Sequence, residues 1–113
     1  MKKSTIKKII ENGGATLTKQ GKKVNYKKGY QVSKKDCFIL NIENVELICE
    51  KVNELLQKIN KNDFVGLWVD NGKIYIDISI KFNILENALQ FGKLNKQLSI
   101  FDWKNQTCIF LED

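Results

Sequence analysis

The residues of this chain that could support acid–base or metal chemistry are carboxylates, because its 113 residues include no histidine. Histidine is the usual catalytic base near neutral pH, and the sequence contains no Gly-x-Ser-x-Gly, Walker or Rossmann motif. Aspartates on neighbouring strands can hold a divalent metal ion, so a metal-dependent enzyme that uses Asp77 and Asp102 is one alternative. Asp102 is also a natural residue to open a turn, whereas Asp77 has no such local explanation. Our leading expectation is a protein that is not an enzyme and holds no cofactor or metal.

The cysteines and the N-terminal segment indicate where the protein resides. Cys37, Cys49 and Cys108 are an odd number without close spacing, so they predict neither a disulfide framework nor a zinc site. Lys7 and Lys8 interrupt the apolar residues near the N-terminus, which argues against a signal peptide. No window approaches the roughly 18 apolar residues of a membrane span. We therefore expect a cytoplasmic protein with reduced cysteines.

Positive charge is concentrated in the first third of the chain. Residues 1–35 hold eleven lysines and one acidic residue, a net charge of +10, whereas residues 36–113 carry −4. A cationic region attracts phosphate or an acidic protein surface. Every cation is lysine, and the absence of arginine disfavours sequence-specific reading of bases; a genome rich in A and T would also explain the lysines. The candidate contact residues here are Lys19, Lys22, Lys23, Lys27 and Lys28.

The strongest structural signal is Asn71-Gly72, which predicts a two-residue type I′ hairpin turn within residues 64–82. Closing the chain there places Trp68 opposite Tyr75 and Gly66 opposite Asp77. Side chains alternate across a strand. One face of the hairpin therefore collects the aliphatic residues, which we expect to face the core: Val65, Leu67, Val69, Ile74, Ile76 and Ile78.

The opposite face of this hairpin carries the candidate partner-binding residues, namely Trp68, Tyr75, Asp77 and the nearby Phe64. Exposed aromatic side chains can stack on single-stranded bases or anchor a protein partner. Trp103, in the last predicted turn, is a further exposed aromatic candidate. In the alternative interpretation, Tyr26 and Tyr30 of the N-terminal part cover this face and create a second core layer.

The remaining patterns predict one domain over residues 1–113, with residues 1–13 a flexible or short helical basic segment. Hydrophobic periodicity favours a helix over residues 44–60 that Asn44 caps. The pattern Asn83-x-x-Glu86 predicts a capping box that opens a second helix, with Ile84, Leu85 and Leu94 among its inward residues. The expected strands are residues 15–19 and 22–26, with Leu17 opposite Val24, then 30–33, 37–42, 64–70, 73–82, 98–102 and 107–111. The fold class is α+β, a mostly antiparallel sheet built from hairpins with two helices packed on one face.

Five short stretches of the chain resemble a set of small single-domain proteins carried on phages, plasmids and conjugative elements of Gram-positive bacteria. They are Gly13-Gly14-Ala15-Thr16-Leu17, Gly29-Tyr30-Gln31-Val32-Ser33, Gly66-Leu67-Trp68-Val69-Asp70, Tyr75-Ile76-Asp77-Ile78-Ser79 and Asn95-Lys96-Gln97-Leu98-Ser99-Ile100-Phe101-Asp102. The resemblance implies a mobile-element accessory protein. Such proteins are often inhibitors of host defence, and anti-CRISPR proteins are the prominent class, which bind an RNA-guided nuclease without catalysis.

Three functional hypotheses follow. The leading one is an anti-CRISPR-type inhibitor that binds a CRISPR effector nuclease, or its guide RNA, through the cationic N-terminal region and the face that carries Trp68 and Tyr75. The second is a small basic nucleic-acid-binding protein without sequence specificity that uses the same lysines. The third is the metal-dependent enzyme that uses Asp77 and Asp102. The sequence does not indicate which nuclease is bound or the oligomeric state.

Overall fold

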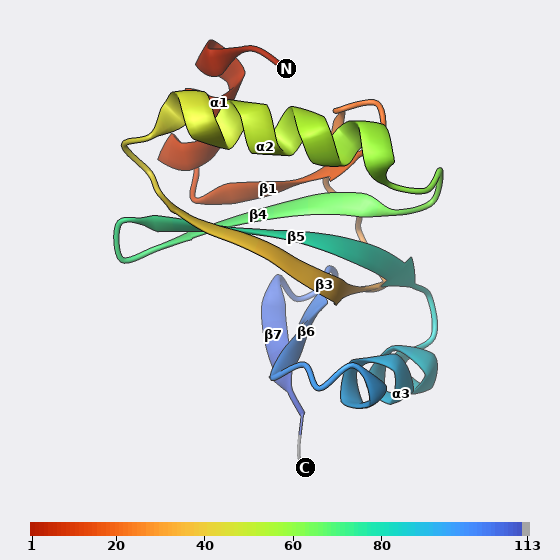
Figure 1. The fold of residues 1–113 in the computed structure, drawn as a ribbon. Helices are drawn as coiled ribbons and strands as arrows, with labels where there is room; N and C mark the ends of the chain where they lie inside the picture. Colours follow the sequence, from red (N-terminus) through yellow and green to blue (C-terminus); the bar gives the residue numbers. More distant parts are fainter. Residues whose placement is uncertain (112–113) are drawn as a thin grey trace.

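The computed structural model describes residues 1–111, which fold into three helices and a seven-stranded antiparallel sheet, an α+β fold (Figure 1). The strand order across the sheet is β2-β1-β4-β5-β3-β6-β7. The helices are α1 (Lys3–Glu11), α2 (Val45–Lys58) and α3 (Leu85–Leu94). The strands are β1 (Gly14–Thr18), β2 (Lys23–Val24), β3 (Tyr30–Asn41), β4 (Phe64–Asp70), β5 (Lys73–Phe82), β6 (Ser99–Asp102) and β7 (Thr107–Phe110). Over the described residues, no helix combines the length and apolar character needed to cross a membrane.

The central hairpin β4–β5 has the predicted register. Trp68 stands opposite Tyr75 and Gly66 opposite Asp77. Asn71 and Gly72 have φ angles of 50° and 76°, as a type I′ turn requires. The aliphatic face is buried or packed against the core, as expected. Because the two-residue turn fixes the pairing, this hairpin also fixes which side chains face away from the core.

The core is divided into two clusters, each beneath different helices. In the larger one, Ile6 of α1 and Ile48 and Val52 of α2 pack on the strands around Leu17 and Ile76. The smaller cluster lies beneath α3 and is built from Val32, Ala88 and Ile100. Figure 1 shows α1 and α2 beside β1 and β4, and α3 at the other end of the molecule, beside β6.

The N-terminal hairpin differs from its predicted register by one residue. Thr16, rather than Leu17, stands opposite Val24. The loop contains three residues instead of two, because the Thr18 amide donates to the Lys22 carbonyl at 2.9 Å. Gly21 within it has a φ of 81°, which suits a three-residue hairpin loop with a left-handed residue. Pairing then stops after β2, so the following segment is free to leave the sheet.

The predicted strands over residues 30–33 and 37–42 form one continuous strand, β3. Two register shifts, between Ser33 and Lys35 and between Asp36 and Phe38, interrupt its pairing with β5. Each shift reverses the face to which the following side chains point. The alternation of polar and apolar residues within residues 30–42 therefore breaks twice, and this pattern predicts two strands in place of one.

One helix cap is confirmed and one is wrong. The Asn44 side chain accepts a hydrogen bond from the Leu47 amide at 3.4 Å. At α3, Ile84 occupies the cap position, without a side-chain hydrogen bond. The predicted capping box fails because the helix begins at Leu85, so that Glu86 stands one position too early to complete it. Three side chains expected to point inward here are exposed instead: Ile84, Leu85 and Leu94.

Candidate functional site

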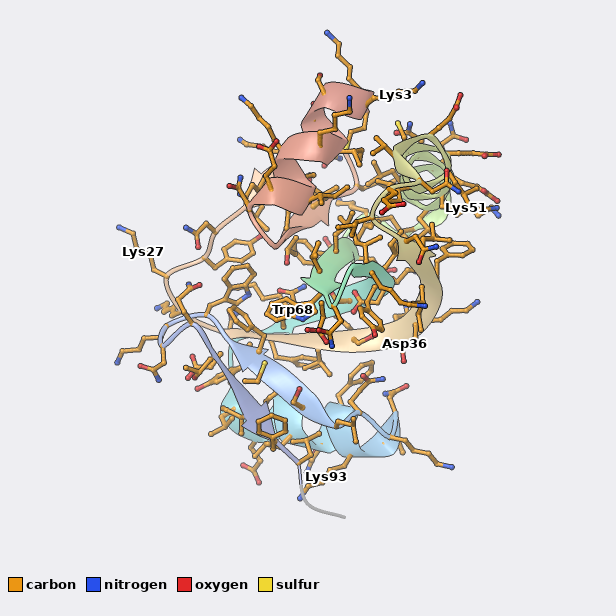
Figure 2. The ribbon with its side chains drawn as sticks, turned by 90° about the vertical axis from the view of Figure 1, so that its left-hand side faces the viewer. Lys3, Lys27, Asp36, Lys51, Trp68 and Lys93 are labelled. Carbon is orange, nitrogen blue, oxygen red and sulfur yellow. The ribbon has the colours of Figure 1, made fainter. Side chains whose placement is uncertain are left out.

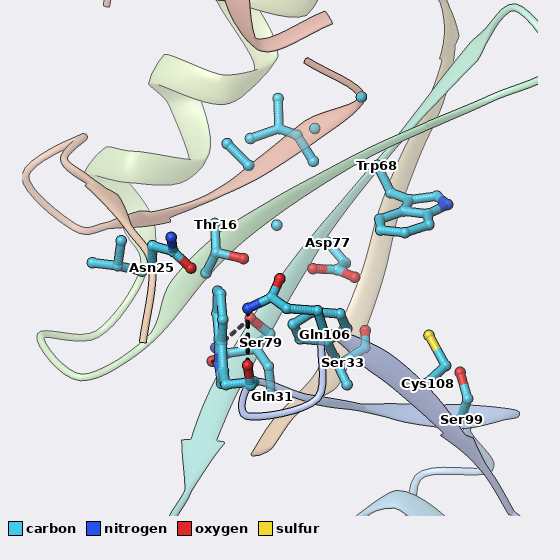
Figure 3. A pocket seen from close by; sticks show the side chains of 18 of the residues that line it. Thr16, Asn25, Gln31, Ser33, Trp68, Asp77, Ser79, Ser99, Gln106 and Cys108 are labelled. Carbon is cyan, nitrogen blue, oxygen red and sulfur yellow. Dashed lines mark hydrogen bonds between the residues drawn. The ribbon is translucent and has the colours of Figure 1, made fainter. Parts of the chain in front are cut away.

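A cavity of about 580 Å³ lies on the face of the sheet opposite the larger core cluster (Figure 3). Its lining includes Lys23 of β2 and Cys108 of β7, although these two strands are the opposite edges of the sheet. The sheet therefore curls across this face, and the β6–β7 hairpin closes one side of the cavity. We call this cavity the pocket.

Strand alternation brings polar side chains into the pocket. On β5, Asp77 and Ser79 point toward it, and the core residues Ile76 and Ile78 point the other way. On β3, Gln31 and Ser33 line it in the same manner. The positions that the sequence pattern marks as non-core on separate strands thus converge on one site.

Two consecutive side-chain hydrogen bonds form one wall of the pocket. Trp103 Nε1 donates to Gln31 Oε1 at 3.0 Å. Gln31 Nε2 in turn donates to Ser79 Oγ at 2.9 Å, and both of these residues are labelled in Figure 3. Gln31 and Ser79 are both buried. Because the buried side-chain polar atoms of Trp103, Gln31 and Ser79 all have partners, these hydrogen bonds fix the geometry of the wall.

Trp103 and Phe64 are not exposed, contrary to prediction. Their side chains retain only 6% and 9% of their exposed surface. Tyr26 packs edge-on against both, with ring centroids 6.0 Å from Phe64 and 5.5 Å from Trp103. The reason is that the chain leaves the sheet after β2 and lays Tyr26 between them. Phe64 is therefore covered, and what remains accessible of Trp103 lines the pocket.

Trp68 and Tyr75 are exposed, as predicted, and a third residue extends them. Their exposed fractions are 58% and 39%, and Ile39 of β3 is 61% exposed. Tyr75 stands opposite Trp68 on one side and Ile39 on the other. The three side chains therefore form a row across β4, β5 and β3, which we call the aromatic row. The alternative in which Tyr26 and Tyr30 cover Trp68 and Tyr75 is wrong, since Tyr26 covers Phe64 and Trp103 instead.

Asp77 occupies the floor of the pocket in an unfavourable environment for a charge. Its Oδ1 is buried without a hydrogen-bond partner and occupies the space that a Cβ on Gly66 would need. Asp36 stands directly opposite on β3. Burial, and then the negative charge of Asp36, raise the pKa of Asp77 from 3.8 to about 7.

Asp102, the predicted partner of Asp77 in a metal site, is engaged in the last turn of the chain. Asp102 opens the last turn, where its carboxylate accepts from the Lys104 amide at 3.0 Å and from Asn105 Nδ2 at 2.8 Å. Asp102 is the last residue of β6 and stands opposite Tyr30 of β3, whereas Asp77 stands opposite Asp36. Among residues 1–111, no three acidic or cysteine side chains gather in a way that could hold a metal ion.

The candidate lysines divide into one that is engaged within the fold and four that are exposed. Lys19 Nζ donates to the carbonyls of Leu56, Gln57 and Ile59 at 3.1, 3.2 and 2.7 Å, which closes the C-terminus of α2. The other four project from the surface, as Figure 2 shows for Lys27: Lys22, Lys23, Lys27 and Lys28. Lys19 thus caps the C-terminus of α2, a role that the lysine-rich sequence around it does not indicate.

Sequence reasoning missed Gln31, Ile39 and Asp36 as site residues. Gln31 could have been found, because it alternates with Tyr30 and Val32 as a polar residue in a strand. Ile39 and Asp36 could not, because the two register shifts in β3 change the face on which they lie.

Comparisons of the chain with protein-family models, with curated proteins and with solved structures found no match.

Proposed function

We propose that this protein is a non-catalytic binding protein that holds a protein partner on the aromatic row. The observation that carries the proposal is the row itself, in which Trp68, Tyr75 and Ile39 stand exposed and side by side on three central strands. Contiguous exposed apolar side chains are unusual on a protein without a partner. Tryptophan and tyrosine also contribute more binding energy than other residues at protein interfaces.

The charge distribution favours a partner with an acidic surface. Residues 1–35 carry a net charge of +10, and Lys22, Lys23, Lys27 and Lys28 are exposed without an ion pair among the described residues. An acidic surface around an apolar centre would complement these lysines and the row together. The resemblance to mobile-element proteins gives this partner a specific form, an RNA-guided effector nuclease, with the protein acting as an anti-CRISPR-type inhibitor.

The proposal is tested by mixing the purified protein with guide-loaded effector nucleases and measuring co-elution, affinity and DNA cleavage at moderate salt. We expect a stable complex and inhibited cleavage. Trp68→Ala and Tyr75→Ala should each weaken binding about tenfold or more. Phe110→Ala is the matched control, because Phe110 is an exposed aromatic residue on a different part of the surface.

Binding to nucleic acid alone would contradict the proposal. Affinity for single-stranded oligonucleotides that falls steeply with salt, with no complex formed with a nuclease, would favour the nucleic-acid-binding alternative. Equal losses from Trp68→Ala and Phe110→Ala would show that the aromatic row is not the contact surface.

A further inference from the structure

We propose that the pocket binds a guanidinium group, with Asp77 as its anionic contact and Trp68 as the aromatic surface on which it stacks. This site adjoins the aromatic row and shares Trp68 with it, whereas Tyr75 and Ile39 do not line the pocket. The ligand is either an arginine side chain of a protein or a free guanidinium compound. The proposal does not depend on the nuclease-binding function above.

Asp36 and Asp77 form a pair of carboxylates without a counter-charge in an ion pair within residues 1–111. Asp36 and Asp77 stand directly opposite each other on β3 and β5, where like charges destabilise a sheet. None of the ion pairs among the described residues includes either aspartate. A cationic ligand in the pocket would relieve this repulsion.

One carboxylate oxygen of Asp77 lacks a hydrogen-bond donor among the residues that the structure describes. Its Oδ1 is buried and accepts no hydrogen bond, which costs free energy unless a donor is supplied. Glycine at position 66 makes room for the carboxylate, because a side chain there would collide with Oδ1. Asp77 lines the pocket together with Trp68, as Figure 3 shows.

The remaining lining of the pocket combines aromatic rings with a hydrogen-bond acceptor. Trp68, Phe101 and Trp103 all contribute to the pocket, and a planar guanidinium stacks on aromatic rings as well as pairing with carboxylates. Gln106 Nε2 donates to the Trp103 carbonyl at 2.8 Å, so the side-chain oxygen of Gln106 remains an acceptor. A guanidinium has several N–H donors in one plane and can use both kinds of contact, whereas an ammonium is a compact charge without a stacking face.

Binding should also depend on pH. The ionised form of Asp77 predominates above its pKa of about 7, and the cation requires that form. The charged or titratable groups that face Asp77 or line the pocket with it are Asp36 of β3, Lys23 of β2 and Cys108 of β7. We expect the affinity to fall about tenfold from pH 8 to pH 6, in proportion to the ionised fraction of Asp77.

The test is a titration of the full chain with N-acetyl-arginine amide, followed by tryptophan fluorescence and calorimetry. N-acetyl-citrulline amide is the matched ligand control, because it has nearly the same shape without the charge. We expect the arginine compound to bind at least about tenfold more tightly at pH 8. Asp77→Asn should abolish this preference, and Asp70→Asn, an exposed aspartate on the same hairpin, should preserve it.

Equal binding of the two compounds, or an unchanged preference in Asp77→Asn, would overturn the proposal. If Asp77→Asn does not fold, Trp68→Ala at an exposed position and Asp36→Asn provide the same test, and unchanged arginine binding in both would overturn the proposal equally. A short arginine-containing peptide distinguishes the two sources of ligand. Tighter binding of the peptide than of the amide indicates a protein side chain, and equal binding indicates a free guanidinium compound.

Discussion

Replacing Asp77 by asparagine should make the protein more stable at neutral and alkaline pH. Its carboxylate faces Asp36 and has an oxygen without a partner, so the folded state disfavours the ionised form. The pKa of Asp77 is about 7 in the folded protein, against 3.8 for an ordinary aspartate. Each pH unit between these values corresponds to about 1.4 kcal/mol, so the ionised carboxylate lowers the free energy of unfolding by up to about 4 kcal/mol.

The pH dependence has a definite sign. Between pH 3.8 and about 7 the folded protein binds more protons at Asp77 than the unfolded chain does. Stability therefore falls as the pH rises through this window and becomes constant above it. Over the range from pH 5 to pH 8, the loss that Asp77 causes is about 2–3 kcal/mol. Asp77→Asn removes this titration, so its advantage over the natural protein should widen by that amount.

The assay is urea-induced unfolding at pH 5, 6.5 and 8, followed by tryptophan fluorescence. Asp70→Asn is the matched control, because Asp70 is exposed and lies opposite Lys73 at the turn of the same hairpin; its effect should stay below about 1 kcal/mol at every pH. Parallel pH profiles for the natural protein and Asp77→Asn would refute the reasoning, since they would show that the carboxylate is not held in a disfavoured charged state.

Two further substitutions test the contacts that frame the site. Lys19→Met should lower the free energy of unfolding by about 1–2 kcal/mol, because three carbonyls at the end of α2 lose a charged donor. Lys22→Met, at an exposed lysine of the same hairpin, should change the free energy of unfolding by less than about 0.5 kcal/mol. Equal effects of the two substitutions would contradict the capping role of Lys19. Trp103→Phe should cost about 1–3 kcal/mol in urea unfolding, because Gln31 Oε1 loses its buried donor; an unchanged midpoint would show that this bond does not stabilise the wall of the pocket.

Features that depend on neighbours in the sequence could be predicted. The β4–β5 register follows from the two residues of its turn, and it places Trp68, Tyr75 and Asp77 on one face. The periodicity of α2 and its cap at Asn44 are likewise local. The register of β1 and β2 could not be predicted as well, because a glycine at the turn is compatible with loops of two or three residues.

Features that depend on distant segments could not be predicted. Trp103 is buried because Tyr26 and Gln31, more than seventy residues away, reach it. The Lys19 ammonium is bound by carbonyls at the end of a helix that ends nearly forty residues later. These contacts exist only after the sheet has formed and curled, so no pattern near Trp103 or Lys19 indicates them.

The amino-acid sequence by itself determined the α+β class, the central hairpin and the face that Trp68 and Tyr75 share, because turn geometry and side-chain alternation act over a few residues. Only the tertiary structure decided that Ile39 completes the aromatic row, that Phe64 and Trp103 are covered, and that Asp77 lies opposite Asp36 in a pocket. The physical reason is that strand order, the irregularities of β3 and the curl of the sheet arise from packing between elements far apart in the chain.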